Sequence, residues 1–230
     1  MAVGWATTFV WWPWCVSATR PIIVAWRLLS GPASEKGKEA AVTRSLIEQV
    51  LEVAGPKAIS LLLADAMYAD GPLLAWLKYR KGIDALVSLP EDRLLYQDLQ
   101  GLADGQLIDW THHRYLRTIQ GHKQVREVEV TAAGELTSWD GFTEKAASYG
   151  VADASLWACL IRDVTTQETA AEPPRALVST RRFADGFAAL QAFRPRWHIE
   201  DDTYRELKEG WGWSSSAGDA ILRRHWGAPP

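Results

Sequence analysis

The chain has few cysteines and no excess of positive charge. Only two of its 230 residues are cysteine, and Cys15 and Cys159 have neither metal-ligand spacing nor the pattern of a disulfide framework. Such usage is typical of the reducing cytoplasm, where we expect the protein to reside. The net charge of −3 excludes a global basic field that would attract nucleic acid. Any contact with nucleic acid therefore requires a local cluster of Lys and Arg.

The first 34 residues contain no Asp or Glu, and Glu35 is the first acid of the chain. Within this region the apolar stretch Val3–Val16 lacks the preceding basic residue of a signal peptide. It is also too short to span a bilayer, so we expect no membrane partner. We predict a strand there instead. A turn at Arg20 and Pro21 would lead to an antiparallel partner strand over Ile22–Leu29.

The remaining composition is that of a soluble globular protein, with 47% hydrophobic and 23% charged residues. This length suffices for one sizeable domain, alone or with an insertion. Apolar residues at helical spacing predict an amphipathic helix over Lys38–Ala54 with Thr43 on its outward face. The fold class that we predict is α/β.

One apolar run of the chain ends in an acid and then a turn. The run from Ile59 to Ala64 ends in Asp65, and the Gly-Pro pairs at residues 55–56 and 71–72 bound it, as expected for a buried strand. An Asp at such a place is costly unless it is paired. Because strand ends in a parallel sheet open onto the functional crevice, we predict that Asp65 binds a cation. Asp70 is expected to cap the helix that starts near Pro72.

From about residue 92 to residue 175 short alternating runs replace these patterns, and they predict strands. The runs are Gln106–Trp110, His113–Gln120, Lys123–Thr131 and Ser155–Val164. The polar segment Gln167–Pro174 is predicted to be a loop. It precedes a last strand over Arg175–Thr180 and helical structure from Arg182.

A charged aromatic segment, Arg196-Trp197-His198-Ile199-Glu200, follows that helix. It resembles the glutamate motif of IS4-type DDE transposases, a Tyr, two residues, an Arg, three residues and a Glu, with Phe193 in place of the Tyr. The family's downstream Lys lies seven residues after the Glu, whereas Lys208 lies at 208 − 200 = 8. Asp65 and Tyr68 similarly resemble the segment that carries the family's second catalytic Asp.

The resemblance implies an RNase H-like mixed sheet with flanking helices and a β-rich insertion before the final helix. It also implies that Asp65 and Glu200 are catalytic and hold Mg²⁺ or Mn²⁺, and that Arg196, Lys208 and Tyr68 contact DNA or support the site. The expected function is metal-dependent cleavage and transfer of DNA strands at transposon ends. The expected divisions are a core over 1–91, an insertion over 92–174, the Glu segment over 175–212 and a tail over 213–230.

The acid-free start leaves no residue to match the family's first catalytic Asp. We therefore expect Met1 to lie inside a longer ancestral gene, and the chain alone to be inactive. Without the family's first strand, one edge of the sheet would be exposed, and this edge is expected to favour a homodimer. The alternative is a non-catalytic DNA-binding or interaction remnant of a transposase. Basic residues around Glu200 form the candidate DNA patch, namely Arg181, Arg182, Arg194, Arg196, Arg205 and Lys208.

Overall fold

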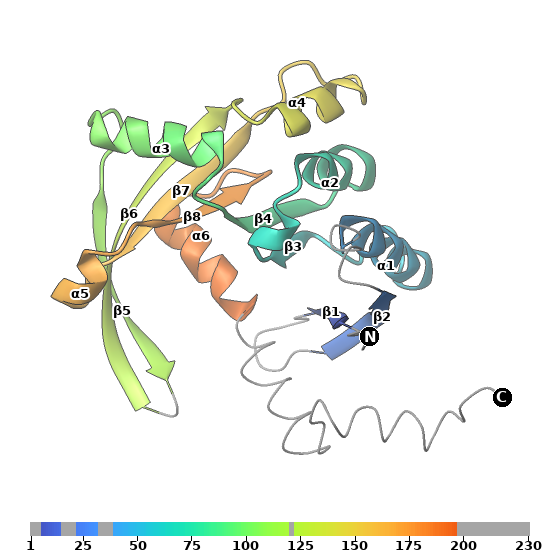
Figure 1. Ribbon diagram of the computed structural model, residues 1–230, viewed down its shortest axis with the longest axis horizontal. Coiled ribbons are helices and arrows are strands. Elements are labelled where there is room, and N and C mark those ends of the chain that lie inside the picture. The colour runs from blue at the N-terminus through green and yellow to red at the C-terminus, as the bar shows by residue number, and fades with distance from the viewer. Residues whose placement is uncertain (1–5, 15–21, 32–38, 120–121, 197–230) are drawn as a thin grey trace, which may run out of the picture. The chain divides into compact units, whose positions relative to one another are not determined.

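The computed structural model describes residues 6–14, 22–31, 39–119 and 122–196 (Figure 1). The described chain falls into two compact units. Residues 39–193 all belong to the larger unit, whereas residues 194–196 belong to the smaller one. Strands β1 (Ala6–Trp14) and β2 (Ile22–Gly31) form a two-stranded sheet of their own, which confirms the pairing predicted for this region.

A six-stranded mixed sheet is the centre of the larger unit. Its order is β3-β4-β8-β7-β6-β5, so the neighbours β4 and β8 in the interior of the sheet come from distant parts of the sequence. Strand β3 runs parallel to β4, and every other neighbouring pair is antiparallel. The strands are β3 (Leu61–Ala64), β4 (Asp84–Leu89), β5 (Thr111–Ile119), β6 (His122–Leu136), β7 (Leu156–Asp163) and β8 (Arg175–Ser179).

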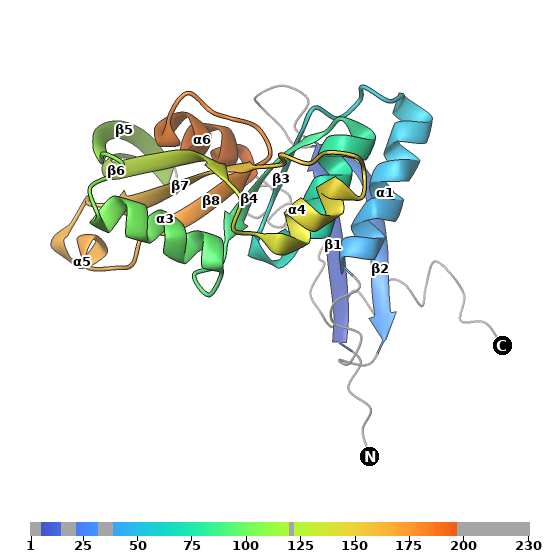
Figure 2. The same ribbon diagram turned by 90° about the horizontal axis from the view of Figure 1, so that it is seen from above.

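Helices lie on both faces of this sheet. Helix α3 covers one face and α6 the opposite face, as the two views show together (Figures 1 and 2). The helices are α1 (Glu39–Ala54), α2 (Gly71–Trp76), α3 (Leu94–Asp104), α4 (Asp140–Ala147), α5 (Gln167–Ala170) and α6 (Gly186–Phe193). Short turns accompany them, namely η2 (Ala66–Tyr68), the π-helical η3 (Leu77–Lys81) and η4 (Arg194–Arg196). The mixed α/β fold class is therefore as predicted.

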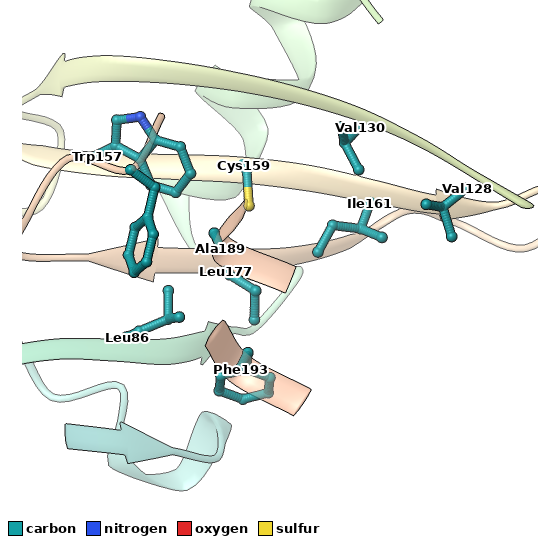
Figure 3. Close-up of a cluster of buried hydrophobic side chains, with 10 residues drawn as sticks. Leu86, Val128, Val130, Trp157, Cys159, Ile161, Leu177, Ala189 and Phe193 are labelled. Carbon is teal, nitrogen blue, oxygen red and sulfur yellow. The ribbon is translucent and has the colours of Figure 1, made fainter. Parts of the chain in front are cut away.

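The core beneath α6 is built from the alternate side chains of four strands. Leu86 of β4, Val130 of β6, Cys159 of β7 and Leu177 of β8 belong to one buried cluster with Phe193 of α6 (Figure 3). Strands in the middle of a sheet that is covered on both faces bury nearly every residue, and all of Leu156–Ile161 is buried. Burial of this apolar surface is the main force that holds the unit together.

The segment predicted to be a β-rich insertion contains two helices, α3 and α4, that were not predicted from the sequence. Residues Leu95, Leu99 and Ala103 repeat every four positions and form the buried stripe of α3. Helix α4 carries a weaker signal, because it buries only Phe142 and Ala146, against α2 rather than the sheet. The predicted strand Gln106–Trp110 is wrong, since these residues form the turn after α3. The strands of this segment also pair in the same sheet as β3 and β4.

Two smaller predictions are also corrected. The predicted loop Gln167–Pro174 begins with the single helical turn α5, which Thr166 starts with a reciprocal hydrogen-bond pair to Thr169. Thr43, predicted to face solvent, is fully buried on α1.

Within the described part of the chain, no helix is both long enough and apolar enough to cross a membrane.

Candidate functional site

Asp65 stands directly after β3, at the carboxyl end of the only parallel strand pair in the six-stranded sheet. Two residues before it, Leu63 packs against the core under α6, as does Leu61. Because side chains alternate along a strand, Asp65 follows Leu61 and Leu63 on the α6 face. Its side chain is half-buried. The acid therefore lies at the edge of the packed core rather than on an open surface.

A tight turn follows Asp65 and brings Tyr68 next to it in the backbone. The Tyr68 amide donates to the Asp65 carbonyl oxygen over 2.9 Å, closing the 3-10 turn η2. Tyr68 is half-buried. Asp65 and Tyr68, which were predicted to belong to one site segment, thus lie in a single turn at the end of β3.

Asp70 has the structural role predicted for it. Its carboxylate accepts a hydrogen bond from the Leu73 amide over 2.7 Å at the start of α2, and Pro72 occupies the first turn. This satisfies one of the amide groups that a helix leaves unpaired at its start. Asp70 is therefore a helix cap and not a second ligand beside Asp65.

Asp84 is the other acid of the parallel strand pair, and it lies at the opposite end. In the register Leu61 pairs with Asp84, and Asp65 comes four residues after Leu61. Four residues of strand span roughly 13 Å, which separates the two carboxylates well beyond the reach of a shared ion. Asp84 instead pairs with Lys78 of η3 at 2.6 Å.

The remaining residues of the predicted site are only partly covered by the structure. Arg196 lies in η4 and belongs to the smaller unit. Glu200 and Lys208 lie outside the described residues. In residues 39–119 and 122–196, no three side chains of His, Cys, Asp or Glu come together in a way that could hold a metal ion. Asp65 is thus the one predicted ligand whose surroundings are described.

The structure describes four residues of the predicted basic patch, namely Arg181, Arg182, Arg194 and Arg196. The Arg181 guanidinium lies 4.6 Å from the centre of the Phe183 ring, and its backbone amide donates to the Ser179 hydroxyl over 3.1 Å. Such a cation over an aromatic ring is held by the negative ring face. Arg181 is therefore tied to the core, whereas Arg182 is exposed to solvent.

One group of charged residues was missed entirely by the sequence reading. Strands β5 and β6 carry Arg114, Arg117, Lys123 and Arg126 in the part of the pair nearest to Ile119 and His122. The available signal was the absence of any acid from Arg114 to Arg126, within a chain whose net charge is negative. The strands were predicted from the alternation of their apolar residues, so the basic residues between them were not recognised as a group.

Comparison with known protein families finds no match, and no curated protein matches the chain.

Proposed function

We propose that the chain is the catalytic part of a DDE transposase of the IS4 type, with an RNase H-like fold. It would cleave DNA strands and transfer them during transposition, with transposon ends as its DNA partner and the cytoplasm as its location. Asp65 and Glu200 would be the metal ligands. The observation that carries the proposal is the position of Asp65, at the carboxyl end of a parallel strand and on the face that α6 crosses.

The edge position of β3 supports this proposal. Strand β3 has β4 on one side, and no other described strand pairs with it. The resemblance expects the strand of the first catalytic Asp to run beside the strand of Asp65. The sheet leaves such a place open within the residues described. Among the described strands, none pairs with the outer backbone groups of β3, which fits the expected tendency to form a homodimer.

The course of α6 supports the pairing of Asp65 with Glu200. The helix starts at Gly186, which packs against Val130 of β6 and Cys159 of β7, and it ends at Phe193 in contact with the cluster that includes Leu86 of β4. Helix α6 also contacts β4, which pairs with the strand that Asp65 follows. Only 200 − 193 = 7 residues separate Phe193 from Glu200. That length bridges at most about 25 Å when extended.

Divalent metal ions fit the chemistry of carboxylate oxygens, and Mg²⁺ or Mn²⁺ is the cofactor proposed here. When bound, such a metal pair would supply an activated water and stabilise the oxygens at the phosphate under attack. The described residues contribute one carboxylate to this donor set, that of Asp65. Arg196 and Lys208 would hold a DNA phosphate, and Tyr68 would steady the turn behind Asp65.

Binding of Mn²⁺, followed by electron paramagnetic resonance, tests this assignment directly. We expect weak binding by the chain, because two carboxylates carry less charge than a metal pair needs. Asp65→Asn and Glu200→Gln should each weaken it by at least about tenfold, or about 1.4 kcal/mol. Asp153→Asn is the matched control, since Asp153 is exposed and precedes β7, which lies three strands away from β3 in the sheet.

If Mn²⁺ affinity is the same in Asp65→Asn, Glu200→Gln and Asp153→Asn, the catalytic site is not where we propose it. The chain would then fit the alternative, a non-catalytic DNA-binding or interaction module. Strong nicking of DNA by this chain that vanishes in Glu200→Ala would contradict the expectation that the chain alone is inactive. It would show that the site is complete without an upstream Asp.

A further inference from the structure

The strand pair of β5 and β6 extends beyond the rest of the sheet (Figure 1). Its register runs from Thr111 opposite Val130 to Ile119 opposite His122. Strand β7 pairs with β6 only from Val128 onward. The outer part of the pair is therefore only two strands wide among the described strands.

The two faces of this pair have different surroundings. Tyr115 of β5 packs against the core under α6, and Val128 and Val130 of β6 belong to that core. Because side chains alternate along a strand, the residues between these positions point to the opposite face, called the open face below. Its members are all exposed or half-buried, namely His112, Arg114, Leu116 and Thr118 of β5 and Lys123, Val125, Glu127 and Glu129 of β6.

The centre of the open face is apolar. Leu116 lies opposite Val125 in the register, and the two side chains are 62% and 40% exposed. Side chains that lie opposite each other in a strand pair have Cβ atoms about 5 Å apart. Leu116 and Val125 therefore form one continuous apolar surface, and its removal from water would be favourable.

Charges of opposite sign flank this apolar centre on β6. Lys123 lies two residues before Val125 and Glu127 two residues after it, each roughly 7 Å along the strand. Among the described residues, Lys123 forms no ion pair. The Glu127 carboxylate has Arg114 at 3.6 Å and His112 at 3.8 Å, both longer than the about 2.8 Å of a charge-assisted hydrogen bond. Both charges can therefore form closer contacts with a partner.

Helix α3 limits how a partner can approach this face. It lies on the same side of the sheet as the open face and contacts β6 and β7 (Figures 1 and 2). Because β7 pairs with β6 only from Val128 onward, α3 covers the inner part of β6 and leaves the outer part clear. Two copies with parallel strand pairs would bring their α3 helices together. Antiparallel strand pairs keep the two helices at opposite ends.

We infer that the open face binds the open face of a second copy of this chain, with the strand pairs antiparallel across a twofold axis at Leu116 and Val125. The axis places each of these side chains on its counterpart in the other copy. Because Lys123 and Glu127 are equally far from Val125, the axis also brings Lys123 of each copy to Glu127 of the other. Such a contact uses the same patch on both copies and is complementary to itself in charge.

The contact is small and is separate from the proposed catalytic site. Over residues 112–118 the strand pair is roughly 20 Å long and about 10 Å wide. The contact thus belongs to the small, transient class of interfaces, which bury less than about 1,200 Å² in total. We therefore expect a reversible dimer. Asp65 follows β3, at the other edge of the sheet from β5, so the dimer does not depend on the metal site.

Sedimentation equilibrium of the full chain from about 1 μM to about 1 mM tests this contact. The unaltered chain should form a reversible dimer. Lys123→Glu and Glu127→Lys should each raise the dissociation constant at least about tenfold, because each replaces two contacts of opposite charge by two of like charge. An equimolar mixture of the two variants should dimerise as the unaltered chain does. In the mixed dimer every Glu at these positions again meets a Lys.

The matched controls are Lys57→Glu and Glu144→Lys, which reverse the same charges at two exposed positions outside β5 and β6. Each control should dimerise like the unaltered chain. The mixture of Lys123→Glu and Glu127→Lys also controls for folding, because it contains only altered chains. Two misfolded variants would not regain the dimer.

Three results would overturn the inference. The first is a monomer over the whole range of concentration. The second is a dimer that Lys123→Glu and Glu127→Lys weaken no more than the controls do, which would place the contact elsewhere, as at the edge of β3. The third is a mixture that stays monomeric, which would show that Lys123 and Glu127 do not meet. The catalytic assignment is judged separately, by Mn²⁺ binding of Asp65→Asn.

Discussion

Gly71 lies where α2 meets α4 so closely that no side chain fits. A Cβ atom built on Gly71 would be 2.6 Å from the Phe142 nitrogen and 2.7 Å from the Gly141 carbonyl carbon. Both are backbone atoms, which cannot rotate away as a flexible side chain would. The contact fixes how the turn after Asp70 meets α4. It therefore also bears on the strand-end turn that carries Asp65.

We predict that Gly71→Ala lowers the free energy of unfolding by about 1–3 kcal/mol, the usual cost of overpacking. The melting temperature should fall by roughly 2–4 °C per kcal/mol for a chain of this size. Gly101→Ala is the control, because Gly101 lies inside α3 and its Cβ would meet nothing within 4 Å. Alanine is the better helix former, so this variant should gain up to about 1 kcal/mol. A similar loss in both variants would show that the α2–α4 contact is not tight.

At the scale of elements, two hydroxyl groups fasten β4 to the end of β8. The Thr180 hydroxyl accepts a hydrogen bond from the Ala85 amide over 2.9 Å, and the Ser179 hydroxyl donates to the Ala85 carbonyl over 2.8 Å. Ala85 is completely buried, so water cannot replace either partner. This junction joins the parallel strand pair of Asp65 to the antiparallel part of the sheet.

Thr180→Val should lower the free energy of unfolding by about 1–3 kcal/mol, because it leaves the buried Ala85 amide without an acceptor. Thr180→Ser keeps the hydroxyl and loses only a methyl group, at a cost of about 0.8 kcal/mol. Urea denaturation of the two variants measures the difference. Equal destabilisation would assign the effect to packing of the methyl group and not to the hydrogen bond.

At the scale of the whole molecule, Cys159 reports on the integrity of the core. Its thiol is fully buried, and burial raises its pKa from the ordinary 9.0 to about 12, with a smaller contribution from the charge of Asp185. The folded state therefore keeps the thiol protonated where the unfolded chain would ionise. The resulting stabilisation is complete below about pH 9 and is lost as the pH rises toward 12.

In a Cys15→Ser background, we predict that Cys159 does not react with a thiol reagent at pH 8 until the protein unfolds. Between pH 9 and pH 11 the free energy of unfolding should fall more steeply with Cys159 present than in Cys159→Ala. Lysines and tyrosines titrate in the same range, so only the difference between the two proteins is informative. Rapid labelling of the native chain at pH 8 would mean that this core opens without global unfolding.

The sequence determined those features of the protein that depend on neighbours along the chain. Apolar runs bounded by Gly and Pro located β3, and the Asp-Gly-Pro order at residues 70–72 predicted the helix cap that the structure confirms. The alternation of residues 125–130 likewise located β6. Such features are set by local backbone preferences and by the period of apolar residues, which are readable in one dimension.

Only the tertiary structure decided which elements lie together. Strand β8 inserts between β4 and β7, although about 90 residues separate it from β4, and no local pattern encodes that choice. Helix α4 is stable because α2 covers Phe142, and Thr43 is buried for a similar non-local reason. The same limit applies to the site. The sequence predicted Asp65 at the end of a strand. Its position on the α6 face of the sheet follows from how the strands pack in three dimensions. The strand register likewise shows that Asp84 is too far from Asp65 to share an ion with it.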